Sequence, residues 1–295
     1  MSQCFSKSIP MAPVSNSDGN DSDSSSPSSS SQSDMQVAET FRPLPETSRP
    51  PPEGFSFDDD VDIELDLGSN DLPDDLTHAH STLSEDEISE LASKYHLPTK
   101  GFWYIAPSSL RAHQSPPGGL AIYEAFLEAG CRFPLEENLA KIFRLVGLCP
   151  SQLVPNGWRS LVSFIICCRG KGVAPKAELF LKLFRLVCID KSELRYSFMA
   201  YSGYKFLVDN PSSLKGWKSR FFFLGSSTIS MGVPSTWGRP YPMVFSREMS
   251  PFEKRGAEIL MSLEHVSTTK LINEQTLSLG GVCRYPCPIV DISLG

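Results

Sequence analysis

The stretch Pro150–Gly170 constrains the fold most, because it is the most apolar long run of the chain that keeps a helical period. It also carries Trp158, one of only four tryptophans. A helix with apolar side chains on most of its sides must be covered on most of its sides. We therefore expect a central, largely buried helix in one domain. Its apolar side chains are Leu161, Val162, Phe164, Ile165 and Ile166.

The segments on either side of this run also have apolar residues at helical spacing. The spacing predicts helices over residues 84–95, 119–129, 135–146, 176–187, 252–263 and, more weakly, 267–277. The composition becomes strand-like in residues 195–208, around a turn at Ser202-Gly203, and again in residues 217–224. The predicted fold class is α+β and predominantly α-helical, with a small antiparallel sheet packed on the helices.

Charge divides the chain into an acidic tail and a mildly basic body. Residues 1–80 contain 16 acidic and three basic side chains, whereas the rest contains 18 acidic and 24 basic ones. The tail is also rich in serine and proline, so it cannot bury enough apolar surface to offset the entropy of ordering. We predict a disordered acidic tail over 1–80, a domain over 81–225, and a partly helical C-terminal extension over 226–295. The extension ends without a boundary signal, as a truncated copy would.

One patterned patch interrupts the tail. Val61, Ile63, Leu65 and Leu67 alternate with acidic residues. This period of two is typical of a short motif that adds a strand to a partner or inserts apolar side chains into it. A solvated acidic linker is the alternative, and it is favoured because a few alternating apolar residues occur often by chance.

No catalytic or metal-binding constellation is recognisable. A transposase-type site needs several carboxylates around two metal ions, and Asp190, Glu193 and Asp209 are the only set that we could assemble in the body. Each is better explained as a loop or turn residue. Cys283 and Cys287 form a spaced pair without the further ligands of a zinc site. We expect no metal, no cofactor and a protein that is not an enzyme.

A second candidate site combines cations with aromatic residues. Lys215, Lys218 and Arg220 are interleaved with Trp217 and Phe221–Phe223, and such a segment can pair with phosphates and stack on bases. The alternative is a strand whose aromatic side chains enter the core while its cations face water. Three consecutive phenylalanines cannot all point outward, which favours the strand.

Cysteine usage and hydropathy indicate the compartment. The chain has eight cysteines, most of them within or beside apolar helical runs, where cysteine behaves as a small buried hydrophobe. We see no signal peptide and no apolar run of the roughly 18 residues that a membrane span needs. The expectation is an intracellular protein of the nucleus or cytoplasm, with free thiols and no membrane association.

Several strings occur in an order and spacing that resemble one family. They are PPGG at 116–119, AIYEAF at 121–126, AGCRFPL at 129–135, PSQLVPNGWR at 150–159, ELF at 178–180 and PSSLKGWK at 211–218. Together they resemble the plant domain labelled as a gypsy-type transposon, or transposase, domain, over about residues 84–225. The resemblance implies a plant source and descent from a long-terminal-repeat element. It supplies no catalytic residues.

Three functions follow as hypotheses. The first is a retrotransposon-derived, non-catalytic module, either gag-like or binding other proteins, which the missing catalytic constellation favours. The second is a transposase- or integrase-type enzyme acting on DNA, and the third is a regulator that binds nucleic acid. The partner is unknown. Self-association and weak nucleic-acid binding are the interactions that we expect.

Overall fold

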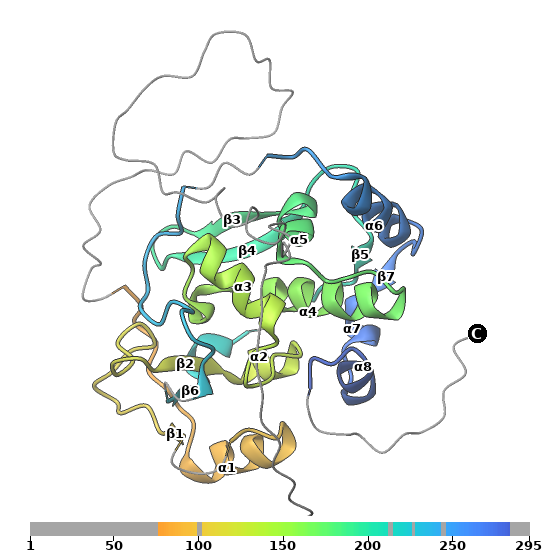
Figure 1. The fold of residues 1–295 in the computed structure, drawn as a ribbon. Coiled ribbons are helices and arrows are strands. Elements are labelled where there is room, and N and C mark those ends of the chain that lie inside the picture. Colours follow the sequence, from red (N-terminus) through yellow and green to blue (C-terminus); the bar gives the residue numbers. More distant parts are fainter. Residues whose placement is uncertain (1–75, 99–101, 212–214, 226–227, 243–245, 284–295) are drawn as a thin grey trace, which may run out of the picture. The chain divides into compact units, whose positions relative to one another are not determined.

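The computed structural model describes residues 76–98, 102–211, 215–225, 228–242 and 246–283 (Figure 1). All of them belong to one compact unit, Val61–Gly295. They form helices α1 to α8 together with small sheets, which confirms the mixed α+β class. Residues 1–75 of the predicted acidic tail, with the patch Val61–Leu67, lie outside the described residues, whereas Leu76 and Thr77 are described and buried.

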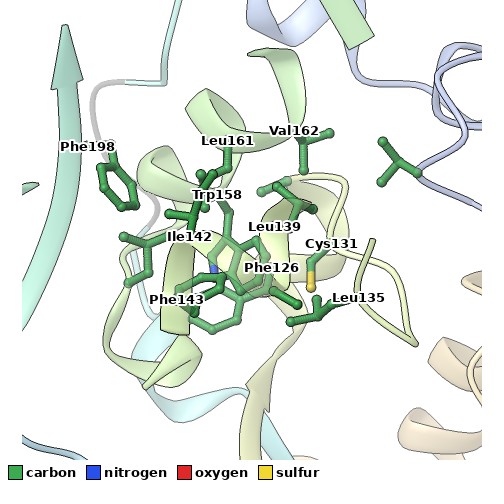
Figure 2. Close-up of a cluster of buried hydrophobic side chains, with 14 of the residues drawn as sticks. Phe126, Cys131, Leu135, Leu139, Ile142, Phe143, Trp158, Leu161, Val162 and Phe198 are labelled. Carbon is green, nitrogen blue, oxygen red and sulfur yellow. The ribbon is translucent and has the colours of Figure 1, made fainter. Parts of the chain in front are cut away.

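The predicted central helix is confirmed as α4, Pro155–Gly170, and it is buried along nearly its whole length. Proline at its first turn is well placed, because the N–H that proline lacks has no helical partner there. Figure 2 shows the Trp158 indole beside the rings of Phe126 and Phe143, whose centroids lie 5.6 Å and 5.1 Å from that of Trp158. These three rings form the middle of the core.

Helices from both sides of the sequence cover α4, which contacts α2, α6, α7 and α8. Two helix ends of the fold carry clear local signals. Ser84 and Glu87 form the capping box of α1, and Gly147 ends α3 in the left-handed conformation with φ of 65°. The helices are α1 (Glu85–Lys94), α2 (Glu124–Glu128), α3 (Glu137–Val146), α5 (Ala177–Leu183), α6 (Pro251–Met261), α7 (Thr268–Leu271) and α8 (Glu274–Leu279).

A three-stranded antiparallel sheet has the order β1-β6-β2, formed by Trp103–Tyr104, Phe221–Leu224 and Leu120–Tyr123. The predicted helix over 119–129 is therefore wrong in its first half. Its residues pair with β6, a fully buried strand whose three phenylalanines enter the core. Pairing with a strand about a hundred residues later overrides the local helical spacing. The segment before β6 is a short 3₁₀ helix, Trp217–Ser219, and not strand.

The second sheet is a hairpin of β3 (Phe184–Asp190) and β4 (Arg195–Ala200). The predicted helix over 176–187 is correct only to Leu183, where α5 ends and β3 begins. The predicted turn at Ser202-Gly203 follows β4, and the hairpin turn itself lies at residues 191–194. β4 is the inner strand, because the Val154 N–H donates to the Tyr196 carbonyl oxygen at 2.8 Å.

The C-terminal region packs on the same core. The helix predicted over 252–263 is confirmed as α6, whereas the one over 267–277 is split into α7 and α8. A two-residue parallel pair, β5 (Leu207–Val208) with β7 (Val266–Ser267), precedes α7. Within the described ranges, no helix is long and apolar enough to cross a membrane. The free cysteines there are Cys131, Cys149, Cys167, Cys168, Cys188 and Cys283.

Truncating the central tryptophan tests this core. Trp158→Ala should lower the free energy of unfolding by about 3–5 kcal/mol, because it leaves a cavity among packed aromatic rings. Met231→Ala is the control, since Met231 is 91% exposed and surface changes cost within about 0.5 kcal/mol. Urea unfolding of the full chain measures both. If Trp158→Ala lowered the free energy of unfolding by less than the control does, Trp158 would not be central to the core.

Candidate functional site

Lys218, one of the three cations considered for nucleic-acid binding, lies between two carboxylates at the β3–β4 turn. Its Nζ lies 2.7 Å from Glu193 Oε2 and 3.7 Å from Asp190 Oδ2. A hydrogen bond from Ser192 holds the pKa of Asp190 below its ordinary value, and the charge of Lys218 adds to that effect. The structure thus brings Lys218, Asp190 and Glu193 together as an ion-paired cluster.

The predicted cation Arg220 joins three elements. It donates to the carboxylate of Glu124 at the start of α2 and, at 3.1 Å, to Oε1 of Glu87 in α1. Hydrogen bonds from Ser84, first its backbone N–H, lower the pKa of Glu87, and the side chain of Arg220 lowers it further. Lys215 lies exposed in the turn before Trp217. A nucleic-acid role for these cations stays a prediction, with Lys218 and Arg220 already engaged in ion pairs.

Arg195, which was not among the site residues predicted from the sequence, lies in a cage of aromatic side chains. Its side chain is 1% exposed, and its guanidinium carbon lies 4.4 Å from the ring centroid of Trp237 and 5.1 Å from those of Trp217 and Tyr123. It donates to the Ser151 carbonyl at 2.9 Å and to Tyr123 Oη at 2.8 Å. Cation–π contacts of this kind stabilise a desolvated guanidinium. Nothing in the local sequence marks Arg195, because its partners are distant along the chain.

The candidate carboxylates do not form a metal site in the described part of the chain. Asp190 and Glu193 pair with Lys218. Asp209 lies beside α7 instead, where its carbonyl oxygen accepts from Thr268 Oγ1 at 3.4 Å. No group of three or more His, Cys, Asp or Glu side chains in that part could hold a metal ion. Cys283 is buried, and Cys287 lies outside the described residues.

The edge of β3 that does not pair with β4 remains available beside these charged clusters. Among the described strands β3 pairs with β4 alone, so its other edge has no strand partner there. Apolar side chains are exposed on this hairpin, with Ile189 55% and Met199 47% exposed, while Val187 is half-buried. The pairing is regular from Phe184 to Cys188, and a bulge follows at Ile189. An edge strand with exposed apolar side chains is a template for another strand.

Cations surround the hairpin. Lys191 follows β3 and is exposed, and the charge of Arg239 acts on both Cys188 and Tyr196. The guanidinium of Arg247 lies 4.2 Å from the ring centroid of Tyr201, directly after β4. We call the edge of β3 together with its neighbouring cations the β3 edge surface. It consists of Val187, Ile189, Met199, Lys191, Arg239 and Arg247.

The described residues thus form an α+β domain with an edge strand that exposes Ile189 and has cations near its hairpin. Residues 121–188, from β2 into β3, match the model of a family described as a putative gypsy type transposon. The match confirms the family resemblance of the sequence. It ends before Arg195 and before the basic segment around Lys218. No curated protein and no solved structure matches the chain.

The aromatic cage predicts that lysine cannot replace arginine at position 195 without a loss of stability. Arg195→Lys should lower the free energy of unfolding by about 2–3 kcal/mol, because an ammonium group cannot donate to both Ser151 and Tyr123 while stacking on Trp237. Arg255→Lys is the control on the exposed face of α6, where its ion pair contributes within about 0.5 kcal/mol. Thermal and urea unfolding provide the comparison. Equal stability of the two variants would contradict the cage.

The Asp190 cluster predicts a pH dependence of stability. Because the folded pKa of Asp190 is lowered, its contribution is complete above its unfolded pKa and is lost as the pH falls through the folded pKa. Asp190→Asn should therefore lose less stability between pH 7 and pH 3 than the original chain. Ser192→Ala, which removes the principal hydrogen bond, should give an intermediate slope. Identical unfolding profiles for all three chains would refute this assignment.

Proposed function

We propose that this transposon-related protein is a non-catalytic protein-interaction module that receives an extended peptide on the β3 edge surface. The observation that carries the proposal is a seven-residue strand, β3, paired on one side within the described residues and bearing the exposed side chain of Ile189. An added strand gains main-chain hydrogen bonds along the edge. Its alternate side chains then lie beside Ile189, the exposed apolar side chain of β3.

Charge defines the kind of peptide. The exposed cations Lys191, Arg239 and Arg247 lie near the hairpin, while the nearby carboxylates of Asp190 and Glu193 are paired with Lys218. The local field therefore favours acidic side chains on the incoming strand, and complementary charge raises both specificity and association rate. The chemistry that fits is an extended segment in which apolar and acidic residues alternate.

The other candidate functions find less support in the same contacts. Asp190 and Glu193 would have to release Lys218 before they could hold metal ions for DNA strand transfer. Lys218 and Arg220 would have to leave their carboxylate partners before they could neutralise phosphates. Self-association of the gag type would use the β3 edge, so the mass of the chain in solution separates it from peptide binding.

A peptide titration tests the proposal. The probe is a fluorescent heptapeptide that alternates isoleucine with glutamate, and the titrated protein is the full chain carrying Ile63→Pro and Leu65→Pro. These substitutions disable the chain's own alternating patch as a competitor, because proline interrupts a hydrogen-bonded strand. Adding Ile189→Lys should weaken binding by about tenfold or more, through lost apolar contact.

Two controls make this titration specific. Met231→Lys introduces the same side chain at an exposed position outside the hairpin and should leave the affinity unchanged. A probe with lysine in place of glutamate should bind more weakly, and the difference should shrink at high salt. No binding of the acidic probe, or equal binding after Ile189→Lys, would overturn the proposed function.

A further inference from the structure

We infer that the chain's own segment Val61–Leu67 adds to β3 as a strand and covers the β3 edge surface from within the same molecule. The inference rests on the proposed function, since it names the first occupant of that surface. It assigns a role to the one patterned patch of the acidic tail. A partner would then have to displace the tail before it could bind.

The segment has the chemistry that the surface selects. Its seven residues equal the length of β3, and Val61, Ile63, Leu65 and Leu67 alternate with Asp62, Glu64 and Asp66. In a strand, successive side chains point to opposite faces. One face of the added strand would therefore be apolar and lie beside Ile189, while the other would be acidic.

Electrostatics favour the same pairing. Residues 1–80 carry a net charge of −13 and the rest of the chain +6. The three carboxylates of the segment would lie on the hairpin near which Lys191, Arg239 and Arg247 are exposed. Attraction between a charged segment and a surface of opposite sign is long-ranged at low salt, so it directs the tail toward this side of the body.

The chain just before α1 passes near the end of β3. The Thr82 N–H donates to the Ser219 carbonyl at 2.8 Å, and the Ser81 hydroxyl donates to the Phe221 carbonyl. Ser219 follows Lys218, whose Nζ reaches Asp190, the last residue of β3. The described residues between Leu76 and α1 thus pass near the strand that the segment would cover.

The length of the chain between the segment and the body favours binding within one molecule. Residues 68–75 separate the segment from Leu76, the first residue that packs on the body, and these eight residues span up to about 26–29 Å when extended. A short tether also gives an effective concentration of about 1 mM. The segment therefore binds β3 of its own chain in preference to β3 of another copy at micromolar protein concentrations.

Hydrogen exchange combined with the peptide titration tests this inference. In the full chain, the β3 amides that do not donate to β4 should exchange at least about tenfold more slowly than in the Ile63→Pro/Leu65→Pro chain. The acidic probe should bind the original chain about tenfold more weakly than that double variant. Val37→Pro/Ala38→Pro is the matched control, because it places two prolines elsewhere in the tail and should behave like the original chain.

The outcomes separate this inference from the proposed function. Slow β3 exchange and weak probe binding in the original chain, both relieved only by the Ile63 and Leu65 substitutions, support the covered edge. Equal probe binding by both chains, with equal β3 exchange, overturns the inference and leaves the proposed function intact. Absent probe binding with unchanged exchange overturns both. If the β3 amides lose their protection on dilution and the mass of the protein in solution halves, the segment pairs with β3 of another copy. That result overturns coverage within one molecule.

Discussion

The burial of α4 is the constraint on which the rest of this structure depends. A helix that is apolar on most sides needs cover from several directions, and α2, β4, α6, α7 and α8 together provide it. The family match ends at residue 188, whereas this cover extends to α8. At Gly130 an added Cβ would lie 2.9–3.1 Å from side-chain atoms of Val162, Ile272 and Leu277. The C-terminal helices therefore complete the core that the matched segment begins.

The charged residues that attract attention in the sequence serve this packing. Arg195 fills an aromatic cage, Arg220 ties α1 to α2 and β6, and Lys218 neutralises the hairpin turn. Removing one partner from a buried or half-buried pair leaves a desolvated charge, so these groups are constrained by stability. What stays available for a partner is main-chain and apolar surface on the hairpin. This division favours binding over catalysis.

Local signals predicted most helices and the strands β4 and β6, but not β2 and β3. The capping box of Ser84, the glycine at 147 and the period of α4 all act within a few residues, and the structure confirms them. β2 and β3 were assigned to helices because residues 119–129 and 176–187 keep helical spacing, while the strand partner of β2 lies far along the chain. The β3 edge surface could not be predicted for this reason. Its proposed occupant, Val61–Leu67, was recognisable from its alternation alone.

An exposed apolar edge is a hazard as well as a binding site, because it invites uncontrolled pairing with other chains. The bulge at Ile189 and the neighbouring cations limit such pairing in part. A tethered acidic strand would limit it further and would set a threshold for partners. With an effective concentration of about 1 mM and an intrinsic Kd of about 100 µM for the tail, a partner's apparent Kd rises about tenfold. Such a tail would keep the edge covered against weak, non-specific strands, yet a partner with a Kd near 1 µM would still displace it at about 10 µM.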